Sequence, residues 1–353
     1  MSLSEQELTE TLRCPGCLGQ LRVKRETGDG IKVALMCSSC AEEFPVIDSI
    51  PRLLLSPFRE ALLGNGIARG VDARQLETAM SFGFEWSRFP EMYEEWNQSF
   101  LDYMQPHGPE FFRGKKVLDA GCGNGRFAYY AAKYGAEVWA IDLGPAVEVA
   151  RENTERLSAD HAGAVQVVQA DLHRPPFAPE SFDFIYSIGV LHHLPDPEEA
   201  FRNLVRYLKP GGEIQIYLYW EPEGQPIKRA LLAMVSAARK ITTRLPHRAV
   251  YALAFPAAVT AFAFFVWPYR LLKGISGLKS LAERIPMKQY AGFPFRVCVN
   301  DQLDRFSAPI ENRYTKQQVA DWLNRAKLES TKVNAAYGWV GTGRKPAPSA
   351  LSR

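Results

Sequence analysis

Three short acidic motifs, each following a run of apolar residues, are the part of this chain best suited to chemistry. "VLDAGCGNGRF" places Asp119 before glycines at alternate positions (Gly121, Gly123 and Gly125), and "VWAIDLG" and "QADLHRPPF" place Asp142 and Asp171. Glycine lets the backbone approach a ligand closely, and an acid after the second strand of such a unit suits ribose hydroxyls. The alternate glycines depart from the GxGxxG pattern of a pyrophosphate-binding turn. The motifs therefore predict a ribose-binding site without a pyrophosphate cradle.

The elements that must position these motifs alternate between apolar strands and amphipathic helices. Strands are expected at 116–120, 137–142, 165–170, 182–187 and 212–219, with helices near 126–134, 145–157 and 198–208. This alternation predicts an α/β fold with a doubly wound parallel sheet and helices on both faces. Ligands in such sheets bind beyond the carboxyl ends of the strands, which is where all three acidic motifs fall.

Taken in order with "FDFIYSIGVLHHLPDPEEAFRNLVRYLKPGG" and "GEIQIYLY", the motifs resemble those of class I S-adenosylmethionine-dependent methyltransferases over residues 117–219. The resemblance implies a Rossmann-like seven-stranded sheet whose last strand is antiparallel. Residues 329–346 can supply the last two strands, after a helix at 315–326.

The resemblance also implies roles for individual residues around S-adenosylmethionine. Asp119 would orient waters or the methionine end of the cofactor, and the backbone of Gly121, Cys122, Gly123 and Gly125 would approach it. Asp142 and Leu143 would lie at the ribose, and Asp171 with Leu172 at the adenine. Ser187 would line the pocket near the methyl group, and Trp86 would cap the cofactor from the N-terminal side.

Two adjacent histidines follow the fourth strand in "GVLHHLPDP". A sulfonium methyl is strongly electrophilic, so an aligned nucleophile carries much of the rate, and a hydroxyl acceptor gains from a general base. His192 is the first candidate for this base and His193 the second, although both can equally cap and pack the following helix. The sequence "SIGV" ahead of them lacks the Asn or Asp followed by two prolines that amino-methylating relatives often carry, which disfavours methylation of a base amine.

Four of the six cysteines form two CxxC pairs, Cys14 with Cys17 and Cys37 with Cys40. This spacing is typical of a zinc ribbon with four thiolate ligands, whereas disulfides or a redox pair are less consistent with a cytosolic chain and a duplicated motif. Residues around "LRCPGCLGQLRV" and "CSSCAEEFPVIDSIPRLL" resemble the small zinc-ribbon proteins that activate tRNA methyltransferases. That resemblance implies a docking or stabilising module with a structural Zn²⁺.

An unusual segment follows the fifth strand. Residues 225–290 contain eleven Lys or Arg and one acid, Glu283, while the whole chain has a net charge of only +3. Ile227, Leu231, Met234, Ala238, Ile241 and Leu245 recur at helical spacing, with Lys228, Arg229, Arg239 and Lys240 roughly opposite. Residues 249–269 are uncharged and just meet the length of a membrane span. A single crossing would separate strands of one sheet, so two interpretations remain: an interfacial hairpin on anionic lipid, or a cap whose apolar face packs on the enzyme.

These observations predict a zinc ribbon at 8–56, a helical lid or linker at 57–113, a methyltransferase domain at 114–224 and 300–346, and a basic, apolar helical insertion at 225–299. The expected activity is O-methylation of a hydrophobic small molecule or lipid-linked acceptor. An RNA methyltransferase is the first alternative, although the modest net charge and the aliphatic insertion make nucleic acid a poorer partner. A non-catalytic cofactor-binding protein is the second. Because the N-terminus shows no secretory pattern, we expect a cytoplasmic chain, with peripheral contact at the inner face of the membrane if the insertion is interfacial.

Overall fold

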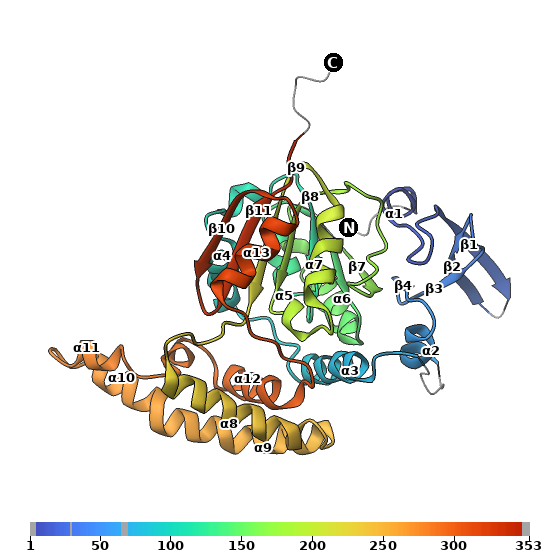
Figure 1. Cartoon of the computed structure of the whole chain (residues 1–353). Helices are drawn as coiled ribbons and strands as arrows, with labels where there is room; N and C mark the ends of the chain where they lie inside the picture. Colours follow the sequence, from blue (N-terminus) through green and yellow to red (C-terminus); the bar gives the residue numbers. More distant parts are fainter. Residues whose placement is uncertain (1–4, 29, 65–69, 348–353) are drawn as a thin grey trace.

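The computed structural model describes residues 5–28, 30–64 and 70–347, so the predicted ribbon and lid are covered except at residues 29 and 65–69. One mixed sheet runs through the molecule in the order β1-β2-β3-β4-β7-β6-β5-β8-β9-β11-β10 (Figure 1). Its strands are β1 (Leu21–Gly28), β2 (Gly30–Cys37), β3 (Glu43–Ile47), β4 (Ile50–Leu53), β5 (Lys116–Ala120), β6 (Glu137–Asp142), β7 (Ala164–Ala170), β8 (Phe182–Ile188), β9 (Leu208–Leu218), β10 (Glu329–Ala335) and β11 (Trp339–Arg344).

The seven strands from β7 to β10 form the predicted α/β sheet. β5 pairs in parallel with β6 and β8, and β11 enters antiparallel between β9 and β10. Alternate residues of a strand face opposite sides of the sheet: in β6, Val138 and Ala140 belong to one apolar cluster, whereas Trp139 and Ile141 belong to the other. Both faces are therefore covered, as a doubly wound fold requires.

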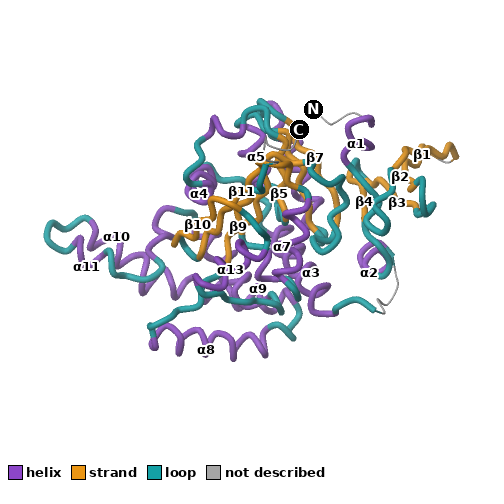
Figure 2. Tube along the Cα trace, turned by 45° about the horizontal axis from the view of Figure 1, so that its top comes forward, coloured by secondary structure: helices purple, strands orange, loops and turns teal. Residues whose placement is uncertain are grey.

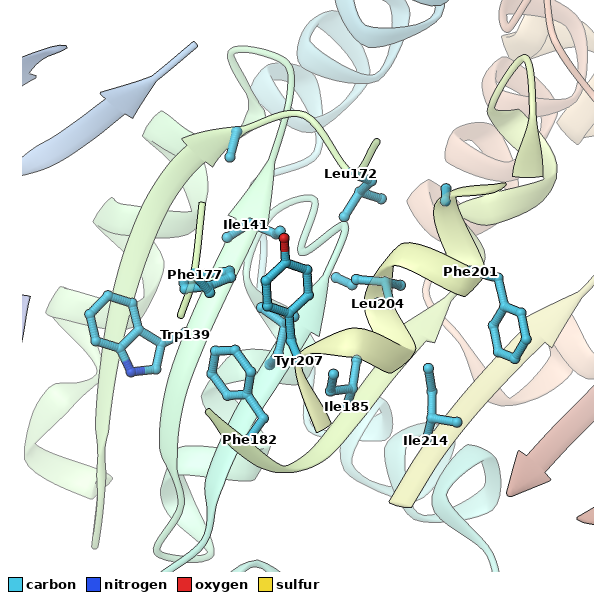
Figure 3. Close-up of a cluster of buried hydrophobic side chains, with 14 of the residues drawn as sticks. Trp139, Ile141, Leu172, Phe177, Phe182, Ile185, Phe201, Leu204, Tyr207 and Ile214 are labelled. Carbon is cyan, nitrogen blue, oxygen red and sulfur yellow. The ribbon is translucent and has the colours of Figure 1, made fainter. Parts of the chain in front are cut away.

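Helices cover the two faces. On one side lie α4 (Glu95–Met104), α5 (Arg126–Lys133) and α6 (Ala146–Arg156), and on the other α7 (Pro197–Arg206) and α13 (Lys316–Arg325). Figure 3 shows the core on the α7 side, where Leu204 and Tyr207 meet side chains of the sheet and of the loop after β7. Phe177 and Phe182 pack there edge to face with ring centroids 5.0 Å apart. Aromatic and branched side chains thus fix the sheet that carries the acidic motifs.

The N-terminal segment extends this sheet. After α1 (Glu5–Thr11), strands β1 to β3 form antiparallel hairpins, and β4 pairs in parallel with β7 through Arg52 opposite Gln169. The two-residue turn between β3 and β4, Asp48 and Ser49, has positive φ at both positions, as a type I′ turn requires. Leu12 and Phe44 are buried in the same cluster as the α7 side of the sheet. The segment therefore shares its core with the main domain.

Between residues 58 and 112, the described residues form α2 (Phe58–Leu63), α3 (Ala73–Arg88), α4 and a short 3₁₀ turn at Pro109–Phe112. Three aromatic residues of this segment, Phe82, Phe84 and Trp86, share one sixteen-residue helix, α3. No single apolar period is visible because α3 has two partners. Phe82 and Trp86 face a cavity, whereas Phe84 packs against the insertion helices.

The insertion consists of α8 (Pro226–Thr242), α9 (His247–Ala261), a π-helical turn (Phe262–Val266), α10 (Trp267–Lys273), α11 (Lys279–Ala282), a 3₁₀ turn (Lys288–Gly292) and α12 (Phe295–Ser307). In Figures 1 and 2 these helices lie together at one end of the molecule, apart from the N-terminal hairpins. The expected boundary at 299/300 is wrong because it cuts through α12. Val297 and Cys298 of that helix are buried with Val250 and Ala254 of α9, so α12 belongs to the insertion core.

Candidate active site

The turn after β5 is built for close backbone approach. Gly121, Gly123 and Gly125 all have positive φ, at 92°, 53° and 81°, a region that other residues enter at a cost. A Cβ on Gly121 would lie 2.4 Å from both Cγ atoms of Val190, and one on Gly123 would lie 2.9 Å from Trp86 Nε1. Glycine is therefore required at Gly121 and Gly123 by both conformation and space.

Asp142, at the end of β6, ties this turn to the next loop. Its Oδ2 accepts a hydrogen bond from Gly123 N at 3.0 Å, and its Oδ1 accepts one from Gly144 N at 3.1 Å. A carboxylate oxygen has further lone pairs, so Asp142 retains acceptor capacity on the cavity wall. Burial raises the pKa of Asp142, and the backbone donors oppose that shift.

Asp119 lies behind the turn and is almost fully buried, and its Oδ2 has no hydrogen-bond partner among the described residues. Burial raises the pKa of Asp119 to about 7; the neighbouring Tyr186 hydroxyl opposes this shift, and the charge of Asp142 adds to it. A buried carboxylate with an unsatisfied oxygen is costly. Such an orphaned acceptor beside a glycine turn fits a site in which a bound cofactor, or water held by it, completes the hydrogen bonding.

A cavity of about 450 Å³ opens at the carboxyl ends of the strands. Of the residues predicted to bind cofactor or to catalyse, its wall includes Trp86, Gly121, Cys122, Gly123, Asp142, Leu143, Asp171, Leu172 and His193. Asp119, Gly125 and Ser187 lie behind this wall. Ser187 is fully buried and donates a hydrogen bond to the Ala120 carbonyl at 2.8 Å, which ties β8 to β5. The predicted place of Ser187 beside the methyl group therefore needs correction, because its hydroxyl is used within the sheet.

The preference for His192 over His193 also needs correction. The His192 ring is fully buried, stacks on Tyr219 with centroids 3.8 Å apart, and has no hydrogen-bond partner among the described residues for either ring nitrogen. His193 lines the cavity, and its Nδ1 lies 2.6 Å from the Ile310 carbonyl oxygen. A carbonyl only accepts, so Nδ1 carries the proton and Nε2 keeps its lone pair. Burial lowers the pKa of His193, which keeps this nitrogen unprotonated at neutral pH.

A group of three carboxylates in the cavity wall was missed by the sequence analysis. Glu85 comes from α3, and Asp301 and Asp304 come from α12. Burial raises the pKa of Asp301 to about 6, and the charge of Asp304 also raises it. Burial raises the pKa of Glu85 well above its usual range, and the charges of Asp304 and Asp301 raise it further. Tyr290 donates a hydrogen bond to Asp301 at 2.7 Å. No local sequence pattern brings Glu85 of α3 together with Asp301 and Asp304 of α12, because the two helices are more than two hundred residues apart in the chain.

Arg126, the first residue of α5, also lines the cavity and faces these carboxylates. Its guanidinium carbon lies 4.3 Å from the ring centroid of Trp96 and 5.1 Å from that of Trp86. Burial lowers the pKa of Arg126, and the negative charges of Asp301 and Glu85 oppose that shift. Arg126 therefore partly balances the negative charge of these carboxylates.

The four CxxC cysteines converge at the other end of the chain. All four Sγ atoms lie within 4.8 Å of one another, with Cys14–Cys40 at 3.7 Å, Cys17–Cys37 at 3.5 Å and Cys17–Cys40 at 3.6 Å. Tetrahedral Zn²⁺ with Zn–S bonds of about 2.3 Å separates its sulfur ligands by about 3.8 Å. The geometry of this cluster therefore fits one zinc ion. Cys122 and Cys298 are buried and lie outside it.

Comparison with known proteins identifies the central part of the chain. Residues 118–216 match the family described as "Methyltransferase domain". The ubiquinone biosynthesis O-methyltransferase of Aliivibrio fischeri is 33% identical over 142 residues, which cover 39% of this chain and 56% of that protein. The phosphoethanolamine N-methyltransferase 1 of Triticum aestivum is 36% identical over 114 residues, which cover 32% of this chain and 22% of that protein.

Among solved structures, a putative O-methyltransferase from Nostoc punctiforme is 14% identical, with a TM-score of 0.43, over 82% of this chain and 66% of that one. The chain spans about half the length of the first curated relatives, or less. The matched residues run from β5 to β9 and include the glycine turn, Asp142 and both histidines.

Proposed function

Because residues 118–216 form a methyltransferase domain of the class that uses S-adenosylmethionine, we propose that this chain is an S-adenosylmethionine-dependent O-methyltransferase acting on a hydrophobic acceptor. The observation that carries the proposal is one cavity whose wall combines two kinds of residue. The glycine turn, Asp142 and Asp171 line it together with His193 and with the apolar side chains of Phe82, Phe293 and Val297, and Phe82 packs edge to face on His193 with ring centroids 4.9 Å apart.

The residues that line the cavity would have distinct roles in binding the cofactor and in methyl transfer. Asp142 would accept hydrogen bonds from ribose hydroxyls, Asp171 and Leu172 would hold the adenine, and Trp86, which lies next to Gly123, would cover the cofactor. The cofactor supplies an electrophilic methyl group on its sulfonium. His193 Nε2 would take the proton of the acceptor hydroxyl as the oxygen–methyl bond forms and the carbon–sulfur bond of the sulfonium breaks. The acceptor would leave as a methyl ether and the cofactor as the neutral thioether S-adenosylhomocysteine, and the His193 imidazolium would then release its proton to water.

The nature of the acceptor rests on the cavity lining and on the relatives together. Phe82, Trp96, Phe293 and Val297 offer aromatic and aliphatic surface, which suits a quinol, a phenol or another lipophilic hydroxyl compound. Relatives named for ubiquinone biosynthesis support this class. The N-methyltransferase relative makes amine acceptors the natural competitor.

We also propose that Cys14, Cys17, Cys37 and Cys40 hold a structural Zn²⁺. The sulfur separations support it, and β4 connects this metal unit directly to the edge of the central sheet. Zinc would then stabilise the start of the chain and, through β4, the side of the sheet that carries Asp171. No chemistry at the cavity is assigned to the metal.

The test is a product analysis with deuterated methyl cofactor. The purified full chain is incubated with S-adenosylmethionine and paired acceptors that differ only in a hydroxyl or an amino group, and the products are identified by mass spectrometry. We expect labelled methyl on the oxygen of an apolar phenol or quinol, with a large loss of turnover in His193→Gln. Methylation of the amine only, or no transfer to any acceptor by a chain that binds the cofactor, would overturn the proposal.

A further inference from the structure

Helix α8 exposes apolar as well as basic side chains. Its apolar residues Leu231, Met234 and Ile241 are 56%, 68% and 67% exposed. Arg239, expected on the solvated polar half, is buried instead and donates hydrogen bonds to the carbonyls of Arg305 and Ala308 at 2.9 and 2.6 Å. On α8, therefore, three residues of the expected apolar stripe are exposed, and one arginine of the expected polar half is buried.

An ion pair explains this orientation. Arg239 pairs with Glu311, which is itself nearly buried and also pairs with Arg313 at 2.6 Å. A buried cation of this kind needs a carboxylate and further acceptors, and the end of α12 with the loop that follows supplies both. The contact anchors α8 to the enzyme and leaves its apolar stripe free.

The long helix next to α8 also has one buried side and one exposed apolar side. The chain is helical from His247 to Lys273, with mean hydropathy 2.0 and only 33% of its most apolar part buried. Val250, Ala254 and Ala258 pack on α12. The opposite side exposes large apolar side chains, of which Phe264 and Leu271 are each 71% exposed. The exposed apolar set on α9, the π turn and α10 is Leu253, Phe255, Val259, Phe264, Trp267 and Leu271.

Positive charge accompanies this apolar surface. Exposed basic side chains occur along α8, at both ends of the long helix and on α11: Lys228, Arg229, Lys240, Arg244, Arg248, Arg270, Lys273, Lys279 and Arg284. The one acid of residues 225–290, Glu283, pairs with Lys288. A wide apolar face bordered by lysine and arginine is typical of helices that lie in the interface of an anionic bilayer.

We propose that the outer face of α8, α9 and α10, here termed the insertion face, binds the surface of a bilayer that contains anionic lipid. The helices lie in the plane of the membrane and do not cross it. A crossing by His247–Lys273 would strip its buried side from α12, and it would place β9 and β11 on opposite sides of a bilayer although they pair in one sheet. A peripheral location at the inner face of a membrane, expected from the sequence, depends on this proposal.

The same insertion also forms one wall of the cavity. α12 packs against α8 and α9, and its residues Val297, Asp301 and Asp304 also line the cavity. Tyr290 and Phe293, from the segment just before α12, line it as well. Packed helices lie about 8–10 Å apart, so a membrane at the insertion face lies one to two helix layers from the site. This link to a lipophilic acceptor rests on the proposed function, whereas membrane binding itself does not.

The experiment is flotation of the full chain with vesicles of phosphatidylcholine alone and of equal parts phosphatidylcholine and phosphatidylglycerol. We expect binding to the anionic vesicles that weakens as salt is raised. Phe264→Glu combined with Leu271→Glu should weaken it at least about tenfold, because two large apolar side chains no longer enter the interface. Ile47→Glu, at an exposed apolar position of β3, is the matched control and should leave vesicle binding unchanged.

Binding of S-adenosylmethionine, measured by calorimetry on each variant, separates a local effect from misfolding and from failure of the proposed methyl transfer. Unchanged cofactor binding with lost vesicle binding supports the proposal, whatever the acceptor proves to be. Absence of binding to both kinds of vesicle, or equal loss in Ile47→Glu, would overturn it. A dimer in solution that the double variant Phe264→Glu with Leu271→Glu converts to a monomer would also overturn it. So would binding of an RNA oligonucleotide by a chain that does not bind either kind of vesicle.

Discussion

Replacement of Asp119 by asparagine should weaken cofactor binding and stabilise the empty protein at the same time. The side chain is buried, its Oδ2 has no partner among the described residues, and its pKa rises from 3.8 to about 7. A buried carboxylate with an unsatisfied oxygen is expected where a bound ligand supplies the missing hydrogen-bond partner. Asp119→Asn keeps the shape and removes the charge.

The size of the stability effect follows from the pKa. An acid whose pKa is raised on folding stabilises the folded state fully only below its unfolded pKa, and this contribution is lost as the pH rises through about 7. One pKa unit corresponds to about 1.4 kcal/mol. Between pH 5 and pH 8 the free energy of unfolding of Asp119→Asn should therefore rise relative to wild type by about 2–3 kcal/mol. Removal of a hydrogen bond made by a charged group should raise the dissociation constant of S-adenosylmethionine by about 10–100-fold.

The assay is urea unfolding of both proteins without cofactor, followed by tryptophan fluorescence at several pH values from 5 to 8, with calorimetric titration of cofactor at pH 7.5. A difference in unfolding free energy that stays flat across this range would refute the buried-carboxylate argument. Wild-type cofactor affinity in Asp119→Asn would refute the role of Asp119 in the site.

Further predictions concern the turn, the base, the metal and the anchor of α8. Gly121→Ala should lower the melting temperature and abolish cofactor binding, because the added Cβ meets Val190 at 2.4 Å; Gly121→Ala combined with Val190→Gly should recover part of the stability in the same thermal scan. His193→Gln should reduce kcat about 10²–10⁴-fold at saturating cofactor, while His192→Phe, which keeps the stack on Tyr219, should change kcat little. Cys40→Ser should lower the zinc content measured by atomic absorption and reduce thermal stability; full stability in a zinc-free protein would contradict the ribbon. Arg239→Ala should cost about 3 kcal/mol in unfolding free energy, because it leaves Glu311 with one of its two partners, and it should increase hydrogen exchange in α8.

The central sheet is predictable from sequence because each strand is a short apolar run with a clear end. β5 and β6 have the expected bounds, Lys116–Ala120 and Glu137–Asp142, and each ends at an acid or at the glycine turn. A strand buried on both faces needs apolar residues at nearly every position, so the signal is local. The glycine turn and Asp142 are predictable for the same reason, since the residues that form them are close in sequence to the strands that place them.

The acidic wall and the orientation of α8 depend on partners far away in the chain. Glu85 and Asp304 meet only after α12 folds back over the cavity, and no local pattern pairs them. Helical spacing identifies two faces of α8 but not which one turns inward. The side of α8 that carries Arg239 turns inward because Arg239 pairs with Glu311 and donates hydrogen bonds to the carbonyls of Arg305 and Ala308, at and just after the end of α12. Which of the two histidines lines the cavity is likewise decided by distant residues: the Ile310 carbonyl holds His193, and the Tyr219 ring stacks on His192.

The most direct test of the central claim is a crystal structure of the full chain with S-adenosylhomocysteine. The ribose should lie at Asp142, the adenine beside Asp171 and Leu172, and the homocysteine sulfur should face His193 across the cavity beyond the glycine turn. A nucleoside bound elsewhere, or a sulfur turned away from His193, would contradict the assignment of this cavity as the site of methyl transfer.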